Sequence, residues 1–143
     1  SETAYEGFIL QLADACMNFD EEQFNRIYHT MVLHTGVTKA VTNVFFSLLE
    51  RVGVYWMNDQ TRPVQEHFIS NLIARKLMLA IASIELPRSG PVTILFNPEG
   101  EQHEIPLLFL HYLLKKRGKR VLYFGADTKI ETIQEYAQDK KVD

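Results

Sequence analysis

Apolar residues recur at helical spacing through the first part of the chain, with polar and charged residues between them. This pattern predicts four helices, over residues 4–18, 20–35, 37–56 and 63–83. Asp20 begins an acidic first turn of the second helix, and Pro63 suits the first turn of the fourth. Because the connections are short, we expect antiparallel neighbours that form a four-helix bundle over residues 1–85.

A different pattern follows the Pro- and Gly-containing linker at residues 86–91. The remaining elements are predicted as strands at 92–96 and 120–125 and helices at 105–116 and 130–138. Gly118 is a stop signal for the first of these helices, and Asp127-Thr128 offers a cap for the second. The order indicates the first part of a Rossmann-like (flavodoxin-like) parallel α/β domain over residues 91–143. Since such sheets usually have about five strands, we expect this chain to be a fragment of a longer protein.

Composition narrows the class of protein. With 46% hydrophobic residues among 143, the chain can bury a good core. The net charge of −3, without a basic stripe, gives these residues no electrostatic footprint for DNA. The single cysteine, Cys16, excludes an internal disulfide and is expected to be a buried, reduced thiol. Without a membrane-length apolar segment or a signal peptide, we expect a soluble, cytoplasmic protein.

The first candidate site lies in the turn between the strand at 92–96 and the helix at 105–116. This turn contains Glu101 and His103. It follows the carboxyl end of a parallel strand, which is where open α/β sheets bind their ligands. An imidazole held there can point outward at a ligand or metal, although a single histidine in a loop is more often a solvated residue.

A second candidate set lies at one end of the predicted bundle. Trp56, the only tryptophan, closes the third helix, and Glu66-His67 follows Pro63 in the first turns of the fourth. The polar link at 58–62 joins the two helices, so these residues are expected at the same end of a helical hairpin. A purely structural interpretation is equally open: Trp56 closes the bundle, and Glu66-His67 complements the positive helix N-terminus.

Together these residues resemble the cobalamin-binding sensor region of MerR-family transcriptional regulators, the light-responsive repressors of the CarH/LitR type. The shared pattern is Trp56, nine intervening residues and Glu66-His67, followed downstream by Glu101-Gln102-His103. The resemblance implies cobalamin, as adenosylcobalamin or methylcobalamin, held between the bundle and the Rossmann-like domain. His103 would be the lower axial ligand of the cobalt, with Glu101 in the same cofactor site. Trp56, Glu66 and His67 would enclose the upper ligand.

The resemblance also implies a function. The chain would be the ligand- or light-sensing region of a regulator rather than an enzyme. Cobalamin would control homo-oligomerisation, and hence DNA binding through a domain that this chain does not contain. No membrane partner is expected.

Two departures from the family pattern keep alternatives open. Pro106 occupies the glycine position of the pattern Glu/Asp-x-His-x-x-Gly, and Met57 follows Trp56, so no second histidine stands there. One alternative is the corrinoid-carrying subunit of a methyltransferase system, which shares the bundle and the histidine loop. The other is a regulator that kept the fold and lost cobalamin, for which Pro106 is the supporting feature.

Several other residues have simpler interpretations. His29 and His34 lack a third ligand, and His111 is expected in core packing or at the surface. The aromatic residues Phe24, Tyr28, Phe45, Phe46 and Phe68 fall at helical spacing and are expected in the bundle core.

Overall fold

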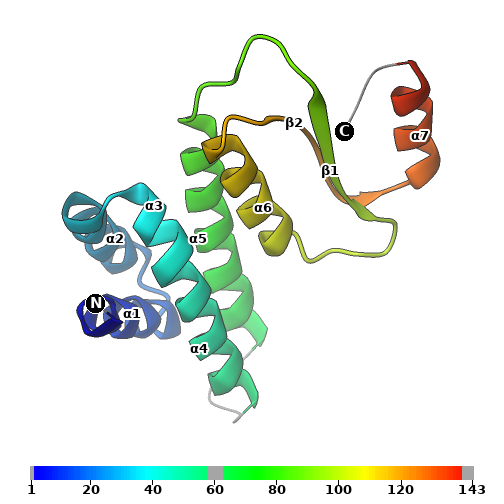
Figure 1. The fold of residues 1–143 in the computed structure, drawn as a ribbon. Coiled ribbons are helices and arrows are strands. Elements are labelled where there is room, and N and C mark those ends of the chain that lie inside the picture. The colour runs from blue at the N-terminus through cyan, green and yellow to red at the C-terminus, as the bar shows by residue number, and fades with distance from the viewer. Residues whose placement is uncertain (1, 58–62, 140–143) are drawn as a thin grey trace. The chain divides into compact units, whose positions relative to one another are not determined.

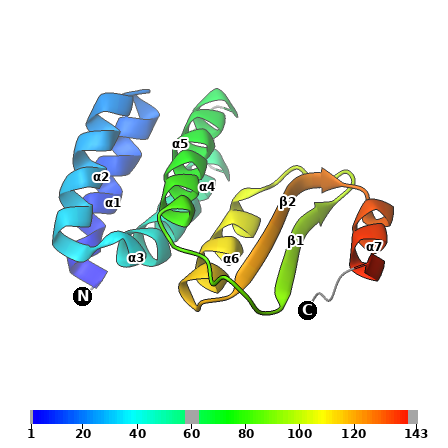
Figure 2. The same cartoon turned by 90° about the horizontal axis from the view of Figure 1, so that it is seen from above.

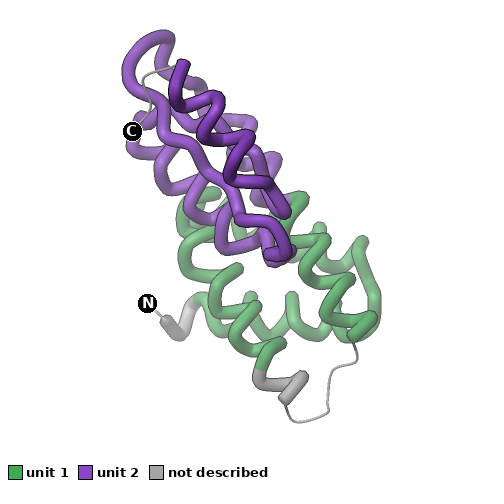
Figure 3. Tube along the Cα trace, turned by 90° about the vertical axis from the view of Figure 1, so that its right-hand side faces the viewer, with its two compact units in different colours: residues 1–75 green, residues 76–143 purple. Residues whose placement is uncertain are grey.

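The computed structural model describes residues 2–57 and 63–139, without the side chains of residues 2–4 and 54–57. It forms two compact units, Ser1–Arg75 and Lys76–Asp143, which Figure 3 distinguishes by colour. None of the helices in the described residues is long and apolar enough to cross a membrane.

The secondary structure of the first unit, in its described residues, is helical (Figure 1). Its helices are α1 (Glu2–Met17), α2 (Glu21–Thr35), α3 (Val37–Lys39), the π-helical segment η1 (Ala40–Phe45), α4 (Phe46–Met57) and α5 (Pro63–Ala82), whose last turns belong to the second unit. Because α3, η1 and α4 follow one another without a break, they correspond to the third predicted helix. The predicted four-helix bundle is therefore confirmed.

Apolar side chains on the inner faces of these helices form the core of the bundle. The fully buried ones include Leu12, Cys16, Phe24, Met31, Val41, Val44, Phe45, Leu48 and Ile69. Burial raises the pKa of the Cys16 thiol to about 12, as expected for a packed, unreactive cysteine. The prediction for Phe46 is wrong, because its side chain is 56% exposed while Phe45 beside it is buried. Val44, Phe45 and Leu48 occupy the core-facing positions at this point of the helix, and Phe46 falls on its outer side.

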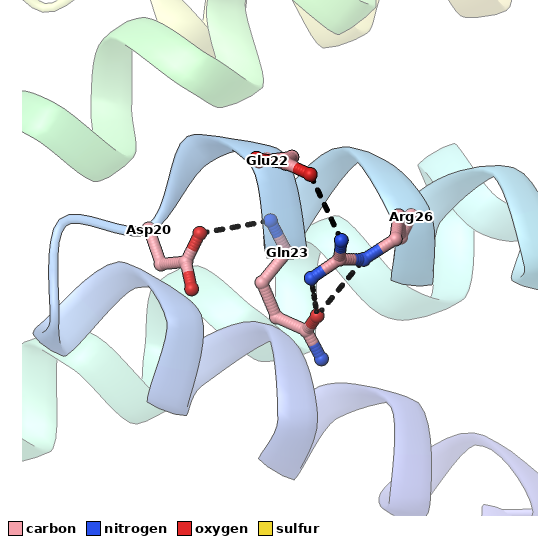
Figure 4. A network of polar contacts seen from close by, with 4 residues as sticks. All are labelled: Asp20, Glu22, Gln23 and Arg26. Carbon is pink, nitrogen blue, oxygen red and sulfur yellow. Dashed lines mark hydrogen bonds and ion pairs between the residues drawn. The ribbon is translucent and has the colours of Figure 1, made fainter.

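The start of α2 shows how its sequence sets a helix boundary (Figure 4). Asp20 is the N-cap residue, and its Oδ1 accepts a hydrogen bond from the backbone N–H of Gln23 at 3.0 Å. One turn further on, the Arg26 guanidinium donates to Glu22 Oε1 at 2.9 Å and to Gln23 Oε1 at 2.6 Å. The acidic first turn thus begins the helix as predicted.

The π-helical segment is a feature that the sequence pattern did not predict. The side-chain hydroxyl of Thr42 donates to the carbonyl of Thr38 at 2.8 Å, and that of Ser47 donates to the carbonyl of Asn43 at 2.9 Å. A π turn changes which backbone N–H reaches each carbonyl. These hydroxyls therefore supply hydrogen bonds to carbonyl oxygens at and beside the segment.

The second unit contains a small α/β arrangement. Its elements after α5 are β1 (Val92–Pro98), α6 (Ile105–Lys116), β2 (Arg120–Thr128) and α7 (Ile130–Asp139). The two strands pair in parallel, and Figures 1 and 2 show α6 and α7 on opposite sides of them. The predicted fold class, a helical bundle followed by the first part of a Rossmann-like domain, is confirmed.

The register of the sheet is irregular toward the carboxyl ends of its strands. Val92 to Leu95 pair one-to-one with Arg120 to Tyr123. Beyond Leu95, Phe96 pairs with Gly125 and Pro98 with Thr128, so β2 contains an extra residue at each of two steps. Such bulges bend a strand and redirect its side chains, often beside functional sites.

A buried lysine joins the end of α5 to α6 within the second unit. Lys115 is 9% exposed, and its Nζ donates to the backbone carbonyl of Ile81 at 2.7 Å. A cation is favourable at the carbonyl end of a helix. This bond is consistent with the division of the two units inside α5; the predicted boundary at 86–91 stays a prediction.

Candidate functional site

The connection from β1 to α6, residues 99–104, is called the His103 loop here. It follows the carboxyl end of β1, as the sequence predicts. The side chain of His103 is 91% exposed, so its imidazole is open to a ligand.

The Glu101 carboxylate orients the His103 imidazole. Glu101 Oε1 accepts from the backbone N–H of His103 at 2.7 Å, and His103 Nδ1 lies 2.9 Å from the same oxygen. These two hydrogen bonds, first the backbone one and then the imidazole one, hold the pKa of Glu101 below its usual range. An ionised carboxylate only accepts hydrogen bonds, so Nδ1 carries the proton. The lone pair of Nε2 is then free for a metal, the arrangement that metal-binding histidines use.

Three further side chains, which sequence reasoning missed, hold the loop in place. Asn97 Nδ2 donates to the carbonyl of His103 at 2.9 Å. The hydroxyl of Tyr123 donates to Glu104 Oε1 at 2.8 Å. Burial, and then this bond, raise the pKa of Tyr123 above its ordinary value. The third is Asp127 on β2, whose Oδ1 accepts from the backbone N–H of Gly100 at 2.8 Å.

The contact of Asp127 corrects the predicted cap of the last helix. That helix, α7, begins at Ile130, and the Asp127 carboxylate bonds to Gly100 in the His103 loop instead. The Thr128 hydroxyl is directed back to the carbonyls of Gly125 and Ala126, at 3.4 Å from each. In the sequence, Asp127 follows the strand predicted at 120–125. An aspartate at such a position can cap the next helix or bond to a neighbouring loop.

Pro106 fits its place in the structure. It lies in the first turn of α6, after the last residue of the His103 loop. The first helical N–H groups have no intrahelical acceptor, so proline costs no hydrogen bond there. The substitution at the family's glycine position therefore leaves the helix start intact.

The other predicted residues lie in the first unit. Trp56 is the residue before the end of α4, and its side chain lies outside the described residues. Glu66 and His67 lie in the first turns of α5, so the three backbones are at the same end of the bundle (Figure 1). His67 Nδ1 is 3.6 Å from Glu66 Oε2, and the Ser70 hydroxyl donates to Glu66 Oε1 at 2.9 Å.

The side chains of Glu66 and His67 are exposed enough to contact a ligand. The side chain of His67 is 77% exposed and that of Glu66 is 47% exposed. Ser70 uses one carboxylate oxygen of Glu66, and the rest of the group can accept further hydrogen bonds. The structure thus groups Glu66 with His67 in one unit, and Glu101 with His103 in the other.

Within residues 2–57 and 63–139, no three His, Cys, Asp or Glu side chains are grouped so as to hold a metal ion. What the His103 loop offers is one imidazole, oriented by one carboxylate. That donor set would supply one ligand to a metal that a cofactor brings with it.

Comparison with protein families identifies the helical part. The family described as "B12 binding domain" matches residues 9–80, just over half of the chain. The chain belongs to this family. The match begins in α1 and ends near the end of α5, so it covers the bundle that carries Trp56, Glu66 and His67.

Two known proteins resemble this B12 binding domain. One is the HTH-type transcriptional repressor CarA of Myxococcus xanthus, 37% identical over 70 residues. That alignment covers 49% of this chain and 24% of the length of the repressor. It confirms the resemblance to a cobalamin-binding region of CarH-type regulators that the sequence pattern indicated.

The other is a solved structure, the methanol:cobalamin methyltransferase complex MtaBC from Methanosarcina barkeri. Its TM-score is 0.51 at 14% identity, over 92% of this chain and 52% of the matched chain. At that identity the likeness shows the fold, including the Rossmann-like part that follows the bundle.

Proposed function

We propose that this B12 binding domain is the sensing region of a transcriptional regulator that holds cobalamin between the bundle and the Rossmann-like part. The single observation that carries the proposal is the His103 loop, where Glu101 fixes the imidazole and leaves Nε2 available. The family match over residues 9–80 and the similarity to a transcriptional repressor support it.

In this proposal His103 would hold the cobalt of adenosylcobalamin or methylcobalamin through Nε2. When bound, the cofactor would supply a reactive cobalt–carbon bond. Glu101 keeps the proton on Nδ1 and raises the basicity of Nε2, as a carboxylate does for other metal-bound histidines.

The pair Glu66-His67 and Trp56 are proposed to cover the upper ligand. The free acceptor positions of Glu66 suit the ribose hydroxyls of an adenosyl group, and an indole ring offers a large apolar contact area. His67 is exposed beside Glu66 and extends the same polar surface.

The proposed output is a change in assembly. Two ligand states that contact a homo-oligomer differently would shift its equilibrium, and DNA binding through another domain would follow. The protein would act in the cytoplasm as a regulator, not as an enzyme. Light is the proposed input when the upper ligand is adenosyl.

The test is substitution of the proposed ligand. We expect His103→Ala to abolish the His-ligated visible spectrum of bound cobalamin, because the remaining loop offers no imidazole. A matched control is His34→Ala, which removes another exposed histidine from α2 and should leave the spectrum unchanged. A His103→Ala protein with the wild-type spectrum would exclude His103 as the ligand.

A further inference from the structure

The irregular end of β2 contacts the His103 loop on both sides of His103. On the N-terminal side, Asp127 makes two hydrogen bonds: Oδ1 accepts from the Gly100 N–H at 2.8 Å, and its own N–H donates to the Glu101 carbonyl at 3.2 Å. On the C-terminal side, Tyr123 donates to Glu104. The loop is therefore held at residues 100, 101 and 104, with His103 between them.

The backbone of Asp127 is unusual for a residue with a side chain. Its φ is +54°, in the left-handed region that costs free energy for residues other than glycine. Asparagine and aspartate tolerate this region best. The conformation directs both the N–H and the carboxylate of Asp127 to the same loop. Strain of this kind persists where the surrounding contacts require one geometry.

The bulge at Gly125 leaves room for the contact between Tyr123 and Glu104. Gly125 has φ of +86°, and a Cβ at this position would lie 3.1 Å from Glu104 Oε1. A larger residue would press on the carboxylate that Tyr123 binds. The two bulges of β2, at Gly125 and near Asp127, thus match the two sides of the loop.

We propose that Asp127 is a positioning residue, which anchors Gly100 and Glu101 so that His103 presents Nε2 to cobalt in one orientation. Tyr123 acts in the same way through Glu104. This inference rests on the proposed function, because cobalamin is the ligand for which the anchored loop would position His103. Neither residue is a proposed metal ligand, so their effect would be on the geometry of Glu101 and His103.

The size of the effect follows from other metal sites. Loss of a partner that orients a ligating histidine usually weakens metal affinity by about 10- to 100-fold. The anchor at Asp127 acts one step further out, through the backbone that carries both Glu101 and His103. We expect Asp127→Ala to weaken methylcobalamin binding by roughly 10-fold, the lower part of that range.

A series at one position separates the carboxylate from the backbone strain. Asp127→Asn keeps an acceptor oxygen and tolerates positive φ, so it should behave as wild type. Asp127→Gly adopts the positive φ without strain but has no acceptor, so any loss it shows is due to the missing carboxylate rather than to the strain that Asp127→Ala adds. Tyr123→Phe removes one hydroxyl without altering the ring and tests the other side of the loop.

Two measurements on the full-length protein read out the series. The first is the apparent Kd of methylcobalamin from visible absorption. The second is deuterium exchange at the Gly100 amide in cofactor-free protein, which reports the anchor without the ligand. Weaker binding and faster exchange in Asp127→Gly, with both restored in Asp127→Asn, is the expected result.

Wild-type affinity and wild-type exchange in Asp127→Gly would overturn the inference. Equal losses in Asp127→Asn and Asp127→Gly would also overturn it, because the acceptor oxygen would then be irrelevant. If the wild-type protein binds no methylcobalamin, the proposed function fails, and exchange at Gly100 alone decides whether Asp127 holds the loop.

Discussion

A single carboxylate oxygen organises the His103 loop. Glu101 Oε1 accepts from both the backbone N–H and the ring of His103, so the turn and the imidazole are fixed by the same atom. The backbone bond orders the loop and the ring bond sets the tautomer. Both hydrogen bonds join residues only two positions apart in the chain. The sequence alone therefore shows that Glu101 and His103 are neighbours.

His111 on α6 shows how burial affects a histidine away from the loop. Its ring stacks on Tyr123, with centroids 4.8 Å apart and planes at 14°. Burial, and then the nearby charge of Lys115, lower the pKa of His111 below its ordinary value of 6.5. The neutral ring is therefore the form that the folded protein prefers.

This shift predicts a dependence of stability on pH. The unfolded chain protonates His111 at higher pH than the folded chain, so the stabilisation is complete above pH 6.5 and is lost as pH falls through the lowered pKa. We expect His111→Phe to reduce the loss in free energy of unfolding between about pH 7.5 and about pH 5.5. Urea unfolding at both values measures it. An identical pH dependence in both proteins would show that His111 is not the group responsible.

Glu101 and His103 could be proposed as site residues from the sequence, whereas the residues that hold their loop could not. Glu101 and His103 lie in a short motif, whereas Asp127 reaches Gly100 from 27 residues away. That contact depends on the register of β2 and its bulges, which no local pattern encodes. The role of Trp56 stays a prediction, because its side chain lies outside the described residues.

Among the elements, α2 begins with a cap whose contribution can be measured. The Asp20 carboxylate accepts from an otherwise unsatisfied N–H of the first turn, that of Gln23 (Figure 4). Nearby Glu22 forms an ion pair with Arg26, in which both side chains are largely exposed.

We expect Asp20→Ala to lower the free energy of unfolding by about 1 kcal/mol, because it leaves a backbone donor of α2 without its partner. The matched control, Glu22→Ala, removes an acidic residue from the same turn and should cost roughly 0.3 kcal/mol. Urea unfolding followed by circular dichroism compares them. Equal costs would mean that charge in the first turn matters and the cap does not.

Element boundaries could be predicted where turn chemistry is local. The helix predicted over 105–116 is α6, and Gly118, with φ of +77°, follows its end. The π-helical segment at Ala40–Phe45 could not be predicted in this way. Its buried residues keep a spacing that an α-helix would also show, so the hydrophobic pattern does not distinguish the two.

The proposed site residues are divided between the two units of the molecule. The family match covers residues 9–80, which contain Trp56, Glu66 and His67. His103 lies outside that match, and its proposed role rests on the geometry of the loop. We propose that both parts serve one cofactor.

The most direct measurement is a visible absorption titration of the full-length protein with adenosylcobalamin, in the dark and then after green light. We expect saturable binding, with the spectrum of a His-ligated cobalamin and a lasting change on illumination. Binding without a response to light would favour a chemical sensor or a methyl carrier. No spectral change up to high micromolar cobalamin would contradict the claim that this chain holds the cofactor.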